Sequence, residues 1–484
     1  MQKSTTESTQ ENLNKNEQEN LPLREKLVWL LNQHRPAFNQ ERVYWRVIAL
    51  VFAELFAFGR HTVTQLLLTL GIVDDDWSGW YRLFSRGRFN EEAVNEVLTR
   101  IAMEQTEDVE PFVIGVDGFQ VPRKSKTMPG TGWLPCLNTA PFKQGIERAQ
   151  RYVEGSWLTP MVNGFSRAIP IRCIPAFPPK AEASDAPSRK EWEAGLQIMD
   201  WVRRQLDRCG RAHQGLLVVA DASFDTLQTW LELPERTWLL VRTKRNRALY
   251  YLPKQRKMRG RPRDYGYKAR PPHAWLKKRR LLKRFKVTIR NRERTMRYRV
   301  CGPFIRDGAP KVPLFLIIVG GQARPKGSRR QRYAPCYYLV SAVQDAQGRW
   351  RLPLTIDQLL PWLWQRWELE VAHRNMKSIL GLGEKQCWNS SSTYVSVQWS
   401  AWVYGLLNMA GHLAWGLNSP KQPPGRWRKT AHRWSFNTLL RGFRAELWQT
   451  AEFQASCVRS LGNWPKKESL VAHMHNAILA SARA

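Results

Sequence analysis

Paired cysteines, long apolar runs and an apolar leader are all missing from this sequence. Its seven cysteines form no CxxC pair and no even framework, which argues against a zinc ribbon and a disulfide scaffold, and a reducing cytoplasm is the compartment we expect. The most apolar stretch, 47–58, is too short to span a bilayer and includes Glu54, so no membrane segment is expected. Residues 1–20 have no apolar h-region, so no secretory signal peptide is predicted. No GxxxxGK[ST] loop is present, which argues against self-contained ATP use.

Acidic residues are also scarce. Lys and Arg outnumber Asp and Glu by 76 to 41, and the net charge is +35. A charge of this size indicates a polyanionic partner. The 484 residues are 43% hydrophobic, which is enough for a sizeable core and two or three domains. The 23 tryptophans include many core residues, and some are free to stack on unpaired bases.

The first hundred residues divide into a polar tail and a helical region. Residues 1–20 have a composition typical of a disordered tail, and from 21 to 107 the apolar residues recur at helical spacing. Within this region, residues 60–86 read either as a helix-turn-helix that binds DNA or as a plain packed helix pair. A helical N-terminal DNA-binding domain is therefore expected over 21–107.

Beyond Pro111 the pattern changes to strands separated by helices, which predicts a mixed α/β layer structure. The polar segment 144–160 is read as lining a substrate groove or as capping a sheet. The expected strands are 112–121, 168–174, 215–221, 237–243, 285–290, 314–320 and 337–342, and the expected helices are 189–208 and 224–233.

A strongly basic stretch interrupts this alternation at 245–286. From residue 255 to 286 there are 14 Lys or Arg against one acid, with aromatic residues between them, a pattern that favours contact with a phosphate backbone. Its Arg-Gly-Arg-Pro-Arg run resembles a core that enters the narrow minor groove of A·T-rich DNA, and the alternative is a solvated charge run. The DNA-binding candidates here are Arg259, Arg261, Arg263, Trp275, Lys277 and Lys278.

Three acidic residues and their basic neighbours form the candidate site. Two five-residue apolar runs stop at Asp117 and Asp221, and a later helical stretch carries Arg366, Glu370 and Lys377 within about 40° of one another on one face. Clustered carboxylates can hold two Mg²⁺ or Mn²⁺ ions for phosphodiester cleavage. Asp225 and Glu368 are the nearest substitutes, and Glu370 is preferred because Glu368 points about 160° away from Arg366. Arg374 is a further DNA-binding candidate.

In order and spacing these motifs resemble a DDE transposase of an insertion sequence, in the IS 4 superfamily and in particular the IS 701 type. Arg366, Glu370 and Lys377 match its Tyr-x2-Arg-x3-Glu-x6-Lys signature, while Leu363 stands at the Tyr position. Trp362 or Trp364 is then the candidate to replace the contact of that Tyr with the DNA backbone. The resemblance covers about 110–410 and implies a ribonuclease-H-like mixed sheet with flanking helices, interrupted by a β-rich insertion. The implied parts are a catalytic domain at 108–244 and 343–415, an insertion at 245–342 and a basic helical C-terminal region at 416–484.

The resemblance also implies a chemistry. Asp117, Asp221 and Glu370 would hold two metal ions, and Arg366 and Lys377 would bind phosphate near the scissile bond. The activity would be cleavage at transposon terminal inverted repeats and joining of the 3′-hydroxyl ends to target DNA, by at least a homodimer. Excision through hairpinned ends would use a Trp to hold a flipped base, with Trp275 as one candidate.

Two other readings stay open at this point. One is a transposase-derived DNA-binding protein that no longer cuts. The other is a carboxylate-pair hydrolase acting on an acidic polysaccharide, which would not require Mg²⁺.

Overall fold

The computed structural model describes residues 21–125, 127–136, 145–178, 188–253, 263–277, 281–321, 334–387, 389–418 and 433–448. The tail expected at 1–20 and most of the basic C-terminal region lie outside the described residues. None of the described helices is long and apolar enough to cross a membrane.

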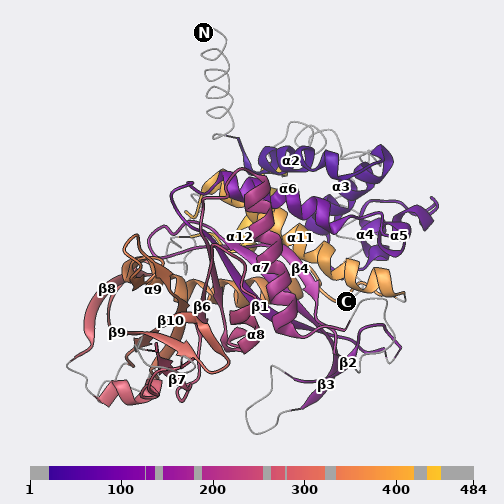
Figure 1. The fold of residues 1–484 in the computed structure, drawn as a ribbon. Helices are drawn as coiled ribbons and strands as arrows, with labels where there is room; N and C mark the ends of the chain where they lie inside the picture. Colours follow the sequence, from indigo (N-terminus) through magenta and orange to yellow (C-terminus); the bar gives the residue numbers. More distant parts are fainter. Residues whose placement is uncertain are drawn as a thin grey trace, which may run out of the picture.

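One mixed sheet of eleven strands forms the centre of the molecule (Figure 1). Its order is β2-β3-β1-β5-β6-β11-β10-β9-β7, with β4 paired to β3 and β8 paired to β9. Strands β1, β5 and β6 are parallel, and β3 runs antiparallel to β1. The strands are β1 (Phe112–Pro122), β2 (Gly132–Pro135), β3 (Ile146–Leu158), β4 (Ala168–Pro175), β5 (Leu216–Ala220), β6 (Thr237–Arg242), β7 (Leu249–Tyr251), β8 (Lys283–Ile289), β9 (Arg292–Arg306), β10 (Ala309–Val319) and β11 (Cys336–Ser341). The predicted ribonuclease-H-like α/β fold is confirmed.

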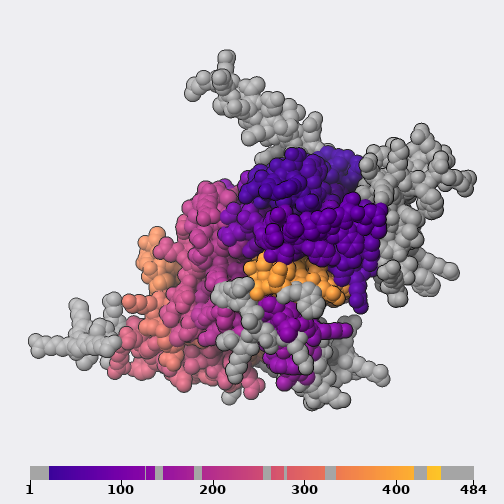
Figure 2. Space-filling view, turned by 90° about the vertical axis from the view of Figure 1, so that its right-hand side faces the viewer, coloured from indigo at the N-terminus to yellow at the C-terminus, as the bar shows by residue number. Residues whose placement is uncertain are grey.

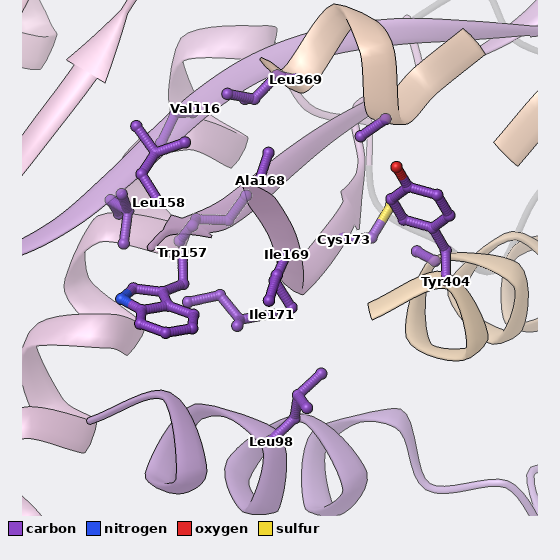
Figure 3. Close-up of a cluster of buried hydrophobic side chains, with 14 of the residues drawn as sticks. Leu98, Val116, Trp157, Leu158, Ala168, Ile169, Ile171, Cys173, Leu369 and Tyr404 are labelled. Carbon is purple, nitrogen blue, oxygen red and sulfur yellow. The ribbon is translucent and has the colours of Figure 1, made fainter. Parts of the chain in front are cut away.

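Helices cover both faces of the sheet. On one face, a Cβ added to Gly155 of β3 would lie 2.3 Å from Ile198 of α7 (Glu191–Arg208). On the other, a Cβ added to Gly115 of β1 would lie 2.4 Å from Leu369 of α10 (Trp367–Ser378). Both glycines therefore allow a helix to approach the sheet closely. Figure 3 shows a buried cluster to which β1, β3, β4, α6, α10 and α11 contribute side chains.

The N-terminal helices pack on α11 (Ser390–Trp415), which is buried along most of its 26 residues. Figure 2 shows the indigo N-terminal helices lying against the orange segment that contains α11. These helices are α2 (Leu23–Gln33), α3 (Glu41–Phe56), α4 (Val63–Thr69), α5 (Ser78–Ser85) and α6 (Glu91–Glu104), and the remaining α-helices are α8 (Leu227–Leu231), α9 (Ile356–Gln365) and α12 (Phe436–Trp448). Their buried side chains belong to the same hydrophobic core as the sheet.

Two expectations of local structure change. The segment 144–160, for which no strand is expected, contains the thirteen-residue strand β3, which is paired on both sides. The helix expected at 224–233 is shortened to α8, with the short 3₁₀ turn η2 (Ala222–Phe224) before it. The strands expected at 285–290, 314–320 and 337–342 are present as β8, β10 and β11, and β11 pairs with β6, so they continue the central sheet.

Candidate active site

Asp117 and Asp221 lie at corresponding positions on neighbouring parallel strands. Val116 of β1 pairs with Ala220 of β5, so the two aspartates follow a matched pair at one end of the parallel register. Asp117 is buried, and its Oδ1 accepts the backbone N–H of Gly118 at 2.9 Å. Asp221 caps η2, and its Oδ1 accepts the backbone N–H of Ser223 at 2.8 Å and the Ser223 hydroxyl at 2.6 Å.

Arg366 connects the first aspartate to the helical glutamate. It lies at the junction of α9 and α10, where the expected continuous helix is interrupted. Its Nη1 donates to Asp117 Oδ2 at 2.8 Å, and its Nη2 donates to Glu370 Oε1 at 2.6 Å. The guanidinium therefore bridges two carboxylates that are 253 residues apart in the sequence.

The charge environment is consistent with a carboxylate cluster. Burial raises the pKa of Asp117 to about 6, the charges of Arg366 and His373 act to lower it, and the nearby charges of Asp221 and Glu370 raise it further. Burial acts to lower the pKa of Arg366, but Asp117, Glu370 and Asp221 hold it above its ordinary value. All three acids thus act on one guanidinium.

The donor set fits hard divalent cations by its chemistry. Three carboxylates supply oxygen ligands of the kind that Mg²⁺ and Mn²⁺ prefer, and a buried carboxylate is stable only when a cation or hydrogen-bond donors compensate its charge. Arg366 provides this compensation for Asp117 and Glu370. Within the described parts of the chain, no three acidic, histidine or cysteine side chains converge closely enough to hold one ion. Metal binding at these residues therefore requires a rearrangement of the Arg366 bridge.

The sequence model of a DDE superfamily endonuclease matches residues 35–302, more than half of the chain. The protein belongs to the DDE superfamily endonucleases. The match contains both aspartates and extends over α3 to α6 and β1 to β8. A search of curated proteins found no match. Family membership supports a nuclease that uses divalent metal ions and acts on DNA, and it argues against the polysaccharide hydrolase.

In this DDE endonuclease the two substitute acids have other partners. Asp225 is fully buried and accepts from Trp230 Nε1 at 3.0 Å, Thr243 Oγ1 at 2.6 Å and Arg306 Nη1 at 2.7 Å, and it also pairs with Arg247. These contacts attach β9 and the segment after β6 to the turn that carries Asp221. Glu368 is buried elsewhere on α10 and accepts from Arg433 Nη2 at 3.1 Å.

The basic candidates lie in different environments. Lys377 is half-buried; burial lowers its pKa, while the charge of Glu147 raises it and that of Arg151 lowers it. Arg374 and Arg263 are exposed. Trp275 is partly buried, donates to Arg270 O at 3.0 Å and lies under Arg299 at 4.6 Å, so its ring is already occupied. Arg259, Arg261, Lys278 and the side chain of Lys277 lie outside the described residues. Of the residues near the signature Tyr position, Trp362 is buried, and Leu363 and Trp364 are partly buried.

Sequence reasoning missed three polar residues next to the acids. Glu191 accepts from Ser223 Oγ at 3.0 Å and from Arg151 Nη2 at 2.7 Å, which links it to Asp221. Glu154 of β3 pairs with Asp117 in the strand register, and His373 of α10 lies 3.4 Å from Glu154. The Glu-x2-His spacing of Glu370 and His373, which places both on one side of a helix, was the available signal.

Proposed function

We propose that this DDE endonuclease is a transposase of the IS 4 superfamily, IS 701 type. It binds the terminal inverted repeats of a transposon, cleaves there and joins the 3′-hydroxyl ends to target DNA. The observation that supports this proposal is the bridge from Asp117 through Arg366 to Glu370, formed beside Asp221 at the end of two parallel strands.

In this proposal Asp117, Asp221 and Glu370 hold two Mg²⁺ or Mn²⁺ ions. When bound, such ions activate the attacking oxygen and stabilise the leaving oxygen. Arg366 then exchanges its two carboxylates for a phosphate of the DNA, a group that its planar fork fits equally well. The partly buried position of Arg366 keeps the guanidinium within reach of both partners.

We further propose that DNA lies across exposed and half-buried basic residues on α10 and in the segment 245–342. Arg374 and Lys377 follow Glu370 on α10, and Arg263 adds a positive charge from the proposed insertion. The outer face of the β8–β9 hairpin adds exposed Arg284, Lys286 and Arg297. The proposed parts are a DNA-binding region at 21–107, a catalytic domain at 108–244 and 343–415, and an insertion at 245–342, acting as a homodimer that brings two ends together.

Cleavage of supercoiled plasmid carrying the element's own ends tests the proposal. Wild-type protein is expected to cut in Mg²⁺ or Mn²⁺ and not in EDTA, and Glu370→Gln is expected to cut about 100-fold more slowly or worse while still binding DNA, because several kcal/mol of metal-based stabilisation is lost. Glu235→Gln, an exposed acid far along the chain from the signature, is the matched control and should cut like wild type. Equal cleavage by Glu370→Gln would overturn the assignment.

The second candidate is a transposase-derived protein that binds DNA without cutting it. The observation that favours it is the Arg366 bridge, which compensates Asp117 and Glu370 without a metal ion. DNA binding by wild-type protein without metal-dependent cleavage, in the same assay, would support this candidate.

A further inference from the structure

A buried glutamate lies directly beside the proposed metal-binding carboxylates. Asp117 of β1 and Glu154 of β3 are register partners in the antiparallel ladder, so their side chains leave the same face of the sheet. Glu154 is fully buried. Without partners, a carboxylate in this position would be strongly destabilising.

The partners of Glu154 come from its own strand and from the helix of Glu370. Its Oε1 accepts the Ser156 hydroxyl at 2.6 Å, and its Oε2 lies 3.4 Å from His373 Nε2. Neither Glu154 Oε2 nor His373 Nε2 makes a hydrogen bond with any residue in the described part of the chain. Their contact with each other at 3.4 Å is therefore the polar interaction that pairs these two buried atoms.

His373 is held against the same strand that carries Asp117. Its ring lies 4.7 Å from the ring of Phe119, two residues beyond Asp117 on the same face of β1. His373 follows Glu370 by three residues, so both side chains project toward the same side of α10. One turn earlier, Leu369 occupies the space that a side chain at position 115 would take.

We propose that Glu154 and His373 form a buried positioning pair that fixes the rotation of α10 on the sheet and so places Glu370 opposite Asp117. Neither residue touches the reacting atoms. Leu369 fixes how closely the helix approaches β1, and the pair fixes which side of the helix faces it. The effect on metal binding rests on the proposed function, whereas the effect on α10 does not.

The test compares two substitutions of His373. His373→Gln keeps an N–H donor near the Nε2 position, and His373→Leu keeps the bulk without the donor. Ser156→Ala is a milder variant at the other oxygen of Glu154. His412→Leu is the matched control, because His412 is a partly buried histidine that packs on Trp157 at 5.4 Å and has no carboxylate partner among the described residues.

The first readout is amide hydrogen exchange in metal-free protein, which reports local opening of the helix. His373→Leu should accelerate exchange in 367–378 by about tenfold or more, Ser156→Ala should do so less, and His373→Gln and His412→Leu should leave this helix within about threefold of wild type. Unchanged exchange of α10 in His373→Leu, or an equal change in His412→Leu, would overturn the proposal.

The second readout is Mn²⁺ affinity, measured as loss of the free-ion electron paramagnetic resonance signal without DNA. His373→Leu should weaken binding about 10- to 100-fold and His373→Gln should restore it. Wild-type affinity in His373→Leu would overturn the positioning of Glu370. If Glu370→Gln binds Mn²⁺ as well as wild type does, the proposed metal site fails, and the exchange result still decides whether the pair positions α10.

Discussion

Arg366 is the cation that offsets the negative charge of the carboxylates in the candidate site. Its guanidinium donates to Asp117 and to Glu370 at 2.8 and 2.6 Å, and Asp221 adds a third negative charge nearby. One cation thus faces three carboxylates. This excess of negative charge is what a divalent ion would relieve, and it also predicts how stability depends on pH.

Asp117→Asn should change that dependence. Burial raises the folded-state pKa of Asp117 to about 6, above its unfolded value, so the contribution of this group to stability is fully present below about pH 4 and is lost as the pH rises through 6. The free energy of unfolding of the variant, relative to wild type, should therefore increase as the pH rises from about 4 through 6. At pH 7 in EDTA the variant should be about 2–3 kcal/mol more stable than wild type. Urea unfolding at four pH values measures this difference, and a difference that stays constant with pH would contradict the account.

At the residue scale, the sequence predicts site residues that end an apolar run or share a helix face with basic residues. It does not predict site residues whose partners lie in another part of the chain. Asp117 and Asp221 stand out because each follows five apolar residues, and Glu370 because Arg366 and Lys377 share its helix face. Glu154 and Glu191 have no such signal. Their partners, His373 and Ser223, lie far along the chain, and only the folded sheet brings them together.

At the scale of elements, two tight turns join the β8–β9 hairpin to the loop between β3 and β4. Asn163 and Gly164 form the turn after β3, Arg290 and Asn291 form the tip of the β8–β9 hairpin, and all four have positive φ, as the hairpin turns of type I′ require. The two tips meet: Arg290 N–H donates to Gly164 O at 3.1 Å, and Asn291 N–H donates to Asn163 O at 3.0 Å.

Gly164→Ala should separate these tips. A Cβ there would lie 2.1 Å from Thr288 O, in addition to the strain of φ +73°, whereas Gly210 has φ +75° with nothing within 4 Å. Gly210→Ala should cost about 1–2 kcal/mol from backbone strain alone. Gly164→Ala should cost roughly 1–3 kcal/mol more and should expose the hairpin tip to hydrogen exchange. Equal destabilisation of the two variants would show that the tips do not hold each other.

Sequence patterns predict some of the strands and miss others. Strand β5 and residues 112–116 of β1 are predicted because both faces are buried and these residues are continuously apolar. Strand β3 begins with polar residues that are read from the sequence as a groove lining or a cap, and β9 carries five arginines in fifteen residues. Their pairing partners, not their composition, make them strands.

At the scale of the whole molecule, the N-terminal helices are joined to the catalytic part by a buried ion pair. Lys385, in the segment after α10, donates to Glu54 of α3 at 2.5 Å, and Trp399 of α11 donates to the same oxygen at 3.0 Å. All three side chains are buried. This contact between residues 331 apart in the chain could not be foreseen from either segment.

A double-mutant cycle on this pair tests whether the contact joins the two regions. Glu54→Gln keeps an acceptor for Trp399 but leaves Lys385 buried and unpaired, and should cost about 3–5 kcal/mol in unfolding free energy. Adding Lys385→Met removes the unpaired charge, so the double variant should be more stable than Glu54→Gln alone. Additive effects in denaturant unfolding would mean that the two side chains act independently.

The central claim is that Asp117, Asp221 and Glu370 bind divalent metal, and metal-directed cleavage of the protein itself tests it most directly. Fe²⁺ is added in place of Mg²⁺ with ascorbate and peroxide, and the backbone breaks near the bound ion are mapped by mass spectrometry. The account predicts breaks close to residues 117, 221 and 370 that excess Mg²⁺ suppresses and that Glu370→Gln diminishes. Breaks confined to other parts of the chain, or no Mg²⁺-sensitive breaks, would contradict it.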